Sequence, residues 1–251
     1  MAAELTGLIA VITGAGSGIG LATARNFAAA GARVFGLDIS AGSMDGVAEW
    51  VQCDVGSTES VAAAFATVSQ SVDTIDILVN NAGIGAIGSI EDATDEEWAR
   101  VLNINVVGIS RVSAAALPFL RRSAAASIVN TCSIAATVGL PQRVVYSASK
   151  GAVQSLTLAM AADLIHEEIR VNCVNPGTAD TPWVARLLGL ADDPSAERTA
   201  LERRQPSGRL VTADEVASAI RFLASPDQLS TTGSVLAIDG GMDGLRVPSS
   251  V

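Results

Sequence analysis

Short runs of valine and isoleucine alternate with longer, alanine-rich stretches along most of this 251-residue chain. The short runs are almost continuously apolar, which is typical of strands buried on both faces, and the longer stretches have the periodicity of amphipathic helices. Regular alternation of the two indicates βαβ units, in which parallel strands form a sheet and the connecting helices cover it. We therefore predict an α/β fold in which one doubly wound parallel sheet of seven strands is flanked by helices.

The expected elements follow one another without a linker, a repeat or a low-complexity segment, so one domain is expected over residues 1–251. The expected strands are 8–13, 33–37, 50–53, 75–79, 127–131, 170–174 and 234–238. The expected helices are 18–30, 57–71, 95–120, 145–167 and 212–224. The segment 182–210 breaks the pattern because it is charged and has a weak strand signal. Insertions of this kind often carry substrate contacts, and we expect a small helical lid there.

The chain is acidic, with 26 Asp and Glu against 16 Lys and Arg and a formal net charge of −10. A protein with this charge repels nucleic acid and anionic membrane surfaces, so neither is expected as a partner. No apolar run approaches the ~20 residues that span a bilayer, and no signal peptide opens the chain. Cys53, Cys132 and Cys173 are widely spaced in apolar surroundings, which indicates reduced core thiols. These observations predict a cytoplasmic protein.

The chain holds a single histidine, His166, among the charged residues at the end of an expected helix. A metal site built on histidines needs more than one of them, and the cysteines lack the spacing of zinc ligands. A Ser-His-Asp triad would have to use this solvated histidine. We therefore expect no metal ion and no hydrolase triad.

A glycine-rich segment, 13–20, follows the first expected strand and leads into the first expected helix. Glycines allow a tight turn, a close approach of the backbone to a pyrophosphate and close packing of helix on strand. The N-terminus of the helix adds unpaired N–H groups and the positive end of the helix dipole. The sheet is therefore expected to be of Rossmann type. The residues expected to bind the cofactor here are Gly14, Ser17, Gly18, Ile19 and Gly20.

Asp38 ends the second expected strand, well beyond the glycines. A dinucleotide-binding fold places a carboxylate about 20 residues after its glycines, where it accepts hydrogen bonds from the adenosine ribose. The same carboxylate repels a 2′-phosphate, and the residues beside it and in the glycine turn carry no compensating positive charge. We therefore expect NAD rather than NADP. Asp54 and Val55, after the third strand, are expected near the adenine ring.

The only tyrosine and the only lysine of the chain, Tyr146 and Lys150, stand four residues apart on an expected helix. Residues with this spacing project from the same face of a helix. A cation beside a phenol favours its phenolate form, which makes a tyrosine usable as a general acid or base near neutral pH. Taken alone, such a pair is more often a buried tyrosine and a solvated lysine. Only the rest of the chain favours the catalytic interpretation.

Several motifs, most of them at the end of an expected strand, occur in a fixed order. They are Thr13-Gly14-x-x-x-Gly18-x-Gly20, Asn80-Asn81-Ala82-Gly83, Asn105, Ser133, Tyr146-x-x-x-Lys150, Pro176-Gly177 with Thr181, and Asp239-Gly240-Gly241. In this combination the chain resembles the short-chain dehydrogenases/reductases over essentially its whole length. The resemblance implies an NAD-dependent oxidoreductase that acts on CH–OH groups, and a homotetramer.

The resemblance also implies a catalytic tetrad of Asn105, Ser133, Tyr146 and Lys150. Tyr146 would exchange a proton with the substrate oxygen while hydride moves to or from the nicotinamide, and Ser133 would donate a hydrogen bond to that oxygen. Lys150 would promote the phenolate and hold the nicotinamide ribose, and Asn105 would anchor a water that links Lys150 to solvent. Tyr146 is expected to contact the cofactor as well. Further residues expected on the cofactor are Asn81, Ala82, Gly83, Pro176, Gly177, Ala179 and Thr181.

Arginines near the expected reaction site bear on the substrate. Arg143 lies three residues before Tyr146, and five arginines, Arg186 and Arg204 among them, lie between Thr181 and residue 210. The planar guanidinium suits a carboxylate, although for the five a solvated helix face that pairs with neighbouring carboxylates is an alternative.

The segments 171–182 and 204–209 resemble cytosolic-type (R)-3-hydroxybutyrate dehydrogenases and bacterial 2-keto-3-deoxy-L-fuconate dehydrogenases, which act on hydroxy acids. This resemblance implies that Arg143 and Arg204 bind a carboxylate. The resemblance includes a third arginine that binds the carboxylate in the hydroxybutyrate dehydrogenases, and Arg186 stands within one residue of its position. Trp183 occupies a position at which the relatives have other residues. Both are expected to contact the substrate.

The sequence thus predicts hydride transfer between NAD and a secondary alcohol, with a small hydroxy acid or sugar-acid derivative as the expected substrate. The same chemistry on a neutral sugar, a polyol or a hydrophobic alcohol is the alternative among enzymes. A regulatory protein that binds NAD without turnover is a third interpretation, but such a protein has no need of a complete tetrad.

Overall fold

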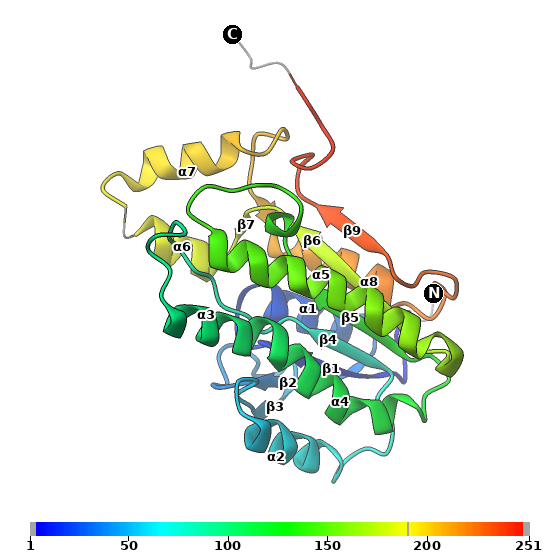
Figure 1. Ribbon diagram of the computed structural model, residues 1–251. Coiled ribbons are helices and arrows are strands. Elements are labelled where there is room, and N and C mark those ends of the chain that lie inside the picture. Colours follow the sequence, from blue (N-terminus) through cyan, green and yellow to red (C-terminus); the bar gives the residue numbers. More distant parts are fainter. Residues whose placement is uncertain (1–3, 190, 248–251) are drawn as a thin grey trace.

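The computed structural model describes residues 4–189 and 191–247, and seven parallel strands in it form one sheet in the order β3-β2-β1-β4-β5-β6-β9. Their bounds are β1 (Ile9–Thr13), β2 (Arg33–Asp38), β3 (Glu49–Gln52), β4 (Ile77–Asn80), β5 (Ser127–Thr131), β6 (Arg170–Pro176) and β9 (Val235–Ile238). The strand order reverses between β1 and β4, and a sheet of this kind has a crevice at the carboxyl ends of the strands on either side of the reversal. The predicted seven-stranded, doubly wound sheet is confirmed (Figure 1).

Helices cover both faces of the sheet (Figure 1). The main helices are α1 (Gly18–Ala29), α2 (Thr58–Val68), α4 (Gly108–Leu120), α5 (Val144–Leu164) and α8 (Ala213–Ala224). Successive residues of a strand serve opposite cores: Val11 packs with α2, α4 and α5, whereas Ile12 packs with α1 and α8. Because both faces are buried, β1 and β4 are apolar at every position but the last. β5 is buried along its whole length as well, but three of its five residues, Ser127, Asn130 and Thr131, are polar.

The helix predicted over 95–120 is interrupted by a π-helical turn. Between α3 (Asp95–Leu102) and α4 lies the turn η1 (Asn103–Val107). Asn105, inside this wide turn, is buried, and its amide pairs with the main chain of Ile84, 2.8 Å from Ile84 N and 2.9 Å from Ile84 O. The wider turn thus lets one side chain hold the loop after β4, and such turns are frequent at functional sites.

By length and composition, the segment from α3 to α4 is the one helix in the described part of the chain that could cross a membrane. Its most apolar window has a mean hydropathy of 1.3 and is 39% buried inside the protein, where α4 contributes to the core. A core helix meets the same criteria of length and composition, so this is a weak indication of a span.

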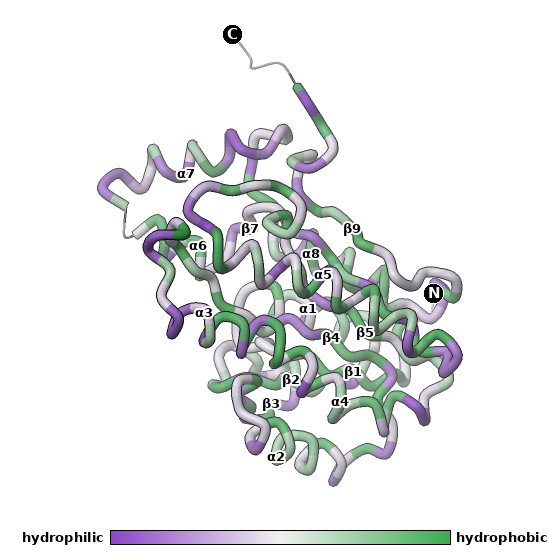
Figure 2. Tube along the Cα trace, in the orientation of Figure 1, coloured by the Kyte–Doolittle hydropathy of each residue, from purple (hydrophilic) through white to green (hydrophobic). Residues whose placement is uncertain are grey.

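The segment after β6 forms a small unit beyond the carboxyl ends of the strands (Figure 1). It contains α6 (Pro182–Leu188) and α7 (Pro194–Arg203), which lie between two short paired strands, β7 (Ala179–Asp180) and β8 (Val211–Thr212). Its buried apolar residues form a cluster of their own: Val184, Leu188, Leu201 and Leu210. The surface of α7 is largely hydrophilic (Figure 2). Two helices are thus found where a helical insertion is expected, and their role as a lid stays a prediction.

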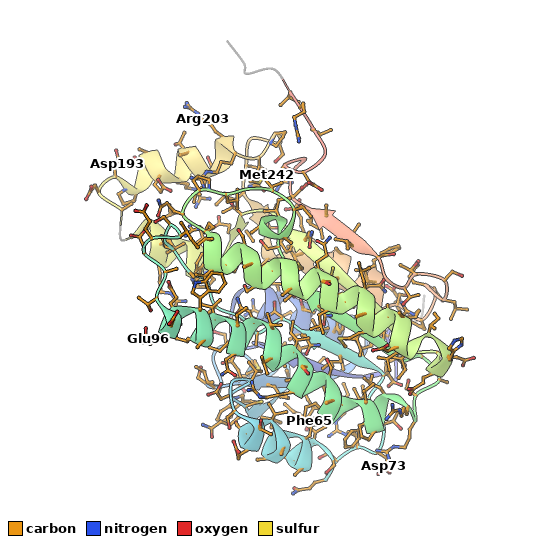
Figure 3. The ribbon with its side chains drawn as sticks, in the orientation of Figure 1. Phe65, Asp73, Glu96, Asp193, Arg203 and Met242 are labelled. Carbon is orange, nitrogen blue, oxygen red and sulfur yellow. The ribbon has the colours of Figure 1, made fainter. Side chains whose placement is uncertain are left out.

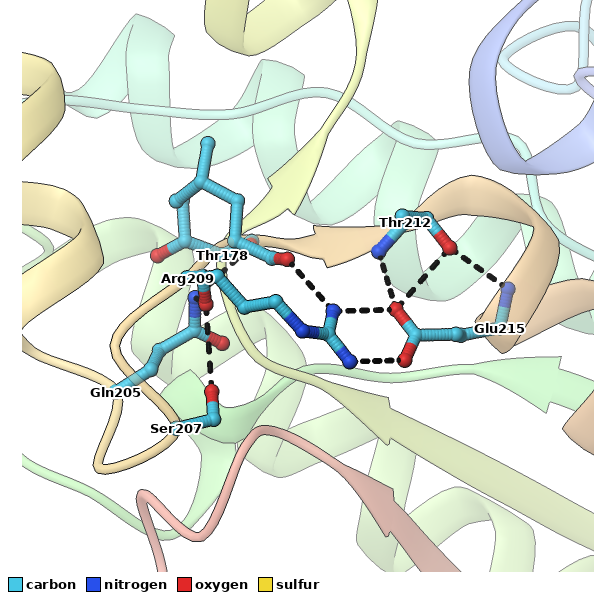
Figure 4. Close-up of polar contacts among 7 residues, drawn as sticks. Thr178, Gln205, Ser207, Arg209, Thr212 and Glu215 are labelled. Carbon is cyan, nitrogen blue, oxygen red and sulfur yellow. Dashed lines mark hydrogen bonds and ion pairs between the residues drawn. The ribbon is translucent and has the colours of Figure 1, made fainter.

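A network around Glu215 anchors the end of this insertion (Figure 4). The carboxylate of Glu215 accepts hydrogen bonds from Arg209 Nη2 at 2.6 Å, from Arg209 Nη1 at 2.9 Å and from Thr212 N at 2.8 Å. Thr212 Oγ1 accepts in return from Glu215 N at 3.1 Å, which completes a capping box at the start of α8. The hydrogen bonds from Arg209, and then those from Thr212, lower the pKa of Glu215 to about 2.

We expect the Glu215→Gln variant to lose an acid-sensitive part of the free energy of unfolding. A carboxyl group whose pKa is lowered by folding stabilises the fold above its ordinary pKa of 4.5, and this contribution is lost as the pH falls toward about 2. The side chains of Arg209 and Glu215 are 58% and 39% exposed, so solvent screening limits the contribution to about 1 kcal/mol. Urea unfolding should be measured near neutral pH and again at a pH below the ordinary pKa of 4.5. Between the two, the free energy of unfolding should fall more for the wild type than for Glu215→Gln. Equal losses would show that the network adds no pH-dependent stability.

Candidate active site

The carboxyl ends of the strands open onto a cavity of about 650 Å³. Its walls come from the segments that follow β1, β2, β4, β5 and β6, together with α5 and the α6–α7 insertion. All the site residues predicted from the sequence line this cavity, except Gly20 and Asn105. The structure therefore brings the expected cofactor and substrate residues together in one place.

The turn after β1 is shaped by close backbone contacts. Gly14 has a φ of 66°, and a Cβ there would lie 2.9 Å from Ala82 Cα. A Cβ on Gly20 would lie 2.1 Å from Gly14 O. Gly20 therefore serves the packing of α1 on the turn and does not reach the cavity, although the sequence predicts it as a cofactor residue.

The N-terminus of α1 carries no protein cap. The side chain of Ser17, which precedes the helix, makes no capping hydrogen bond, and the first turn contains no acidic residue. By contrast, side-chain oxygens cap α2, α3, α6, α7 and α8. The N–H groups and positive dipole end of α1 therefore remain available beside Gly14 and Gly18 at the cavity, and this arrangement fits a phosphate group.

Asp38 is fixed at the cavity wall by the main chain. Its Oδ2 accepts a hydrogen bond from Gly16 N at 2.9 Å, and its Oδ1 accepts one from Ser40 N at 3.2 Å. Each carboxylate oxygen retains a further acceptor position. Asp38 can therefore accept hydrogen bonds from the two hydroxyl groups of a ribose. Its negative charge would repel a 2′-phosphate on that ribose.

Tyr146 and Lys150 lie in the first turns of α5, and both line the cavity. Lys150 Nζ donates a hydrogen bond to Thr131 O at 2.8 Å and lies 5.7 Å from the centroid of the Tyr146 ring. Lys150 is buried, and no carboxylate of the described residues lies within ion-pair distance of it. A buried ammonium without a carboxylate needs other polar partners. The site therefore fits a phenol and a ligand hydroxyl group beside this lysine.

Ser133 stands directly after β5, where it begins the 3-10 turn η2 (Ile134–Ala136). Its Oγ accepts a hydrogen bond from Ala135 N at 3.2 Å. This bond fixes the oxygen and leaves the hydroxyl hydrogen free for donation into the cavity. The side chain can therefore hold a substrate oxygen.

Asn105 lies behind the cavity wall rather than on it. Both hydrogens of its amide are used, one by Ile84 O and the other by Ser149 Oγ at 3.0 Å. Ser149 Oγ in turn donates a hydrogen bond to Tyr146 O at 2.7 Å. Asn105 thus braces the loop after β4 against the first turn of α5. Its expected contact with a water stays a prediction.

Three arginines gather on the substrate side of the cavity: Arg143, Arg186 and Arg204. None of the three forms an ion pair with a described residue. The pKa of Arg143 is lowered, first by burial and then by the positive charge of Arg204. The charge of Glu197 acts on Arg143 in the opposite direction but forms no ion pair with it. Guanidinium groups that line a cavity without a directly paired carboxylate form a site that attracts an anion.

The other arginines of the insertion have different surroundings. Arg198 pairs with Asp180 at 2.7 Å, and Arg209 pairs with Glu215 at 2.6 Å. Arg203 is exposed and points outward from α7 (Figure 3). These three arginines therefore have the surroundings that the alternative of a solvated face describes. Arg186 and Arg204 are also exposed, but they line the cavity, and their contact with a substrate stays a prediction.

Sequence reasoning missed Gln205, which connects the insertion to Thr178 in the loop after β6 (Figure 4). This residue is 1% exposed, and its Nε2 donates to Arg209 O at 2.8 Å and to Thr178 O at 3.3 Å. A Cβ on Gly177 would lie 2.4 Å from Gln205 Oε1, so the glutamine packs directly on the loop after β6. A single buried glutamine in a charged stretch produces no periodic signal that could have revealed it.

The metal-ligating residue types form no cluster among the described residues. No group of three or more His, Cys, Asp and Glu side chains there could hold a metal ion. His166 is exposed in the 3-10 turn η3 (Ile165–Glu167), which follows α5 directly, and the predicted solvated position is confirmed. The three cysteines are free and buried, also as predicted. Burial raises the pKa of Cys53, in the cavity wall, to about 11, which keeps its thiol protonated at neutral pH.

Known proteins match the chain over nearly its full length. A family model described as enoyl-(acyl carrier protein) reductase matches residues 14–243. The chain is 39% identical to cis-4-hydroxycyclohexanecarboxylate dehydrogenase of Sinomonas cyclohexanicum, over 93% of this chain and 95% of that protein. It is 36% identical to dehydrogenase/reductase SDR family member 6 of Rattus norvegicus, over 95% and 98% of the two chains. The ligand-free aldohexose dehydrogenase of Thermoplasma acidophilum superposes with a TM-score of 0.92 at 34% identity, over 100% of this chain and 99% of that chain.

These matches include the segments that build the cavity, from the glycine turn to the α6–α7 insertion. The chain therefore belongs to the short-chain dehydrogenase/reductase family, and it is an oxidoreductase that transfers a hydride between a nicotinamide cofactor and a secondary alcohol or ketone.

Proposed function

We propose that this enzyme interconverts a small hydroxy acid and the corresponding keto acid with NAD as its cofactor. The observation that carries the proposal is the unpaired group of Arg143, Arg186 and Arg204 in the cavity that also holds Ser133 and Tyr146. In a protein of net charge −10, unpaired positive charge at the reaction site supports an anionic substrate. The name of the Sinomonas relative, a hydroxycyclohexanecarboxylate dehydrogenase, supports the same class.

The side chains around the cavity support a separate role for each residue of the expected tetrad. Bound NAD supplies the acceptor of the hydride. The Tyr146 phenolate takes the proton of the substrate hydroxyl and becomes the phenol, and Ser133 Oγ donates a hydrogen bond that holds the substrate oxygen in reach of Tyr146. Lys150 stabilises the phenolate and offers its remaining N–H groups to the nicotinamide ribose. Asn105 keeps the loop after β4 and the start of α5 in register, and we retain its expected water contact as part of the proton route.

The residues that would hold NAD follow the length of the cavity. Gly14, Ser17, Gly18 and Ile19 would meet the pyrophosphate, and Asp38 the adenosine ribose. Asp54 and Val55 would border the adenine, and 81–83 would lie along its ribose. Pro176, Gly177, Ala179 and Thr181 would contact the carboxamide.

We expect Asp38→Ala to relax the preference for NAD. The variant loses an acceptor for the ribose hydroxyls and a charge that repels a 2′-phosphate, so the ratio of kcat/KM for NAD to that for NADP should fall on the order of a hundredfold. Steady-state kinetics with both cofactors measure this ratio. Asp45→Ala, at an exposed aspartate away from the cavity, is the matched control and should leave the ratio within about twofold. An unchanged ratio in Asp38→Ala would remove Asp38 from cofactor selection.

The substrate class is tested by Arg143→Ala. A charge-assisted hydrogen bond between Arg143 and a carboxylate is worth about 1.5–3 kcal/mol, so KM for a hydroxy acid should rise roughly ten- to a hundredfold. KM for the neutral amide of the same acid should change by no more than a few-fold. Arg203→Ala, outside the cavity, is the control and should affect neither. Equal effects on the acid and its amide would contradict the carboxylate site.

A neutral sugar is the second candidate, because the solved structure described above is that of an aldohexose dehydrogenase. A panel of hydroxy acids, sugar acids, free aldoses and polyols, each assayed for NADH formation, separates the two candidates. Preference for an aldose, with no effect of Arg143→Ala, would replace the acid by the sugar.

We also propose that the enzyme works in the cytoplasm as a homotetramer. Val107 in η1 and Leu158 on α5 are large apolar side chains that are exposed to solvent. Such side chains on the surface support association with further copies of the chain. The three free, buried cysteines support a reducing compartment.

A further inference from the structure

Gly85 lies in the loop after β4, and its backbone conformation does not require a glycine. Its φ lies outside the left-handed region, so the conformation accepts any residue. Space is the constraint: a Cβ on Gly85 would lie 2.1 Å from Cζ2 and 2.8 Å from Cε2 of Trp183. The indole therefore rests directly on the backbone of Gly85, and only a residue without a side chain permits this contact.

Trp183 reaches this position from the start of α6, within the insertion. Its neighbour Val184 is buried in the separate apolar cluster of the insertion, so Trp183 is carried by a unit with its own packing. Trp183 and Gly85 both line the cavity, the former on the insertion and the latter on the body of the enzyme. The contact thus joins the two sides of the substrate end of the cavity.

The loop that receives the indole is held on both sides of Gly85. Asn105 binds the main chain of Ile84, and Arg143 Nη1 donates to Ala86 O at 3.3 Å. Gly88 N donates to Gln142 O at 3.1 Å, next to the start of α5. A side chain added at Gly85 would meet the far end of the Trp183 side chain, and the indole can move more readily than this hydrogen-bonded backbone.

We propose that the contact of Trp183 with Gly85 closes the cavity beside the reacting carbon and sets the upper size of the alcohol that the enzyme accepts. This inference rests on the proposed function only in that the substrate is a secondary alcohol. Trp183 is 37% exposed, and its rigid indole lies between the insertion and the loop after β4 at the cavity wall. In this position it leaves room for a small substrate and excludes substituents that would occupy the same space. The contact of Trp183 with Gly85 thus limits the size of the substrate, whereas the arginines of the cavity select its charge.

The size limit is tested with Trp183→Ala, Gly85→Ala and the double variant. The measurement is the ratio of kcat/KM for alcohols with bulky substituents to that for their smallest analogue. Trp183→Ala should raise this ratio at least about tenfold, because cavity space equivalent to several methylene groups is released. Gly85→Ala should raise it in the same direction, because the indole can no longer seat. Gly244→Ala, where a Cβ meets no atom within 4 Å, is the matched control and should leave the ratio unchanged.

The double variant shows whether the two residues act together. If Gly85 acts only by receiving the indole, Gly85→Ala should have no further effect on the ratio once Trp183 is alanine. Equal effects of Gly85→Ala with and without the indole would overturn the pairing. An unchanged ratio in Trp183→Ala would overturn the size limit.

A readout that needs no substrate separates this inference from the proposed function. In a Trp50→Phe/Trp98→Phe background Trp183 is the only tryptophan, since the chain has three. Adding Gly85→Ala should shift its emission to longer wavelength and increase its quenching by acrylamide, because the indole leaves its seat. Emission equal to that of the background would overturn the contact, whatever the substrate. A failure to oxidise any hydroxy acid would instead overturn the proposed function and leave this result in place.

Discussion

Tyr146→Phe is expected to lower kcat on the order of a thousandfold while the enzyme still binds NADH. The phenol is the one titratable hydroxyl of the cavity, and general acid–base catalysis by a positioned side chain typically contributes about 10²–10⁴-fold. Removal of the hydroxyl leaves the ring, so the packing of Tyr146 against Val145 and its neighbours is retained. The measurement is the single-turnover rate of NADH formation at saturating substrate.

Two controls make this result specific. NADH affinity, followed by the fluorescence of the bound cofactor, should change no more than a few-fold, because the ribose contact is assigned to Lys150. The midpoint of thermal unfolding should remain close to that of the wild type. Turnover within about tenfold of the wild type would contradict the assignment of Tyr146 as the proton-transfer group.

The fold follows from features that are local in the sequence. Runs such as Ile9–Thr13 and Ile77–Asn80 are apolar at every or nearly every position because each successive residue enters one of two cores. Because all seven strands are parallel, the residues that follow them meet at one edge. This is why motifs spread from Gly14 to Thr181 could be assigned to one site without a structure.

What the sequence did not reveal depends on contacts between distant segments. The π-turn at Asn103–Val107 exists where Asn105 reaches the main chain of Ile84, and a helical pattern contains no sign of such a contact. Gly20 illustrates the opposite case: the glycine is required, but by Gly14 O rather than by a ligand. In both cases the sequence singled out the residue, but the contacts that it makes with distant segments could not be predicted.

The arginines show how far charge patterns can be interpreted. Arg186 and Arg198 both belong to a charged, helical stretch, and their sequence neighbours do not distinguish them. The structure separates them, because Arg198 is turned to Asp180 while Arg186 faces the cavity. The direction in which a side chain leaves a short helix depends on how that helix packs, and α6 and α7 pack mainly through their own small cluster.

Lys150→Arg is expected to lose at least about a hundredfold in kcat/KM, although the charge is retained. Lys150 is buried, its Nζ lies 2.8 Å from Thr131 O, and a Cβ on Gly83 would lie only 3.7 Å from Nζ. A planar guanidinium is wider than an ammonium and cannot occupy this space with its donors directed at both the phenol and a ribose. Fifteen of the 16 basic residues are arginine, which fits a lysine retained here for its shape.

The two active-site variants should differ in how they affect the cofactor. Lys150→Arg should weaken NADH binding about tenfold or more, since it disturbs the ribose contact, whereas Tyr146→Phe should not. If phenol and ammonium act as one proton-transfer unit, the double variant should have a kcat close to that of the worse single variant rather than the product of both losses. Stopped-flow turnover and fluorescence titration of NADH give the two quantities. An arginine variant with wild-type kcat and wild-type NADH affinity would show that position 150 requires only a positive charge.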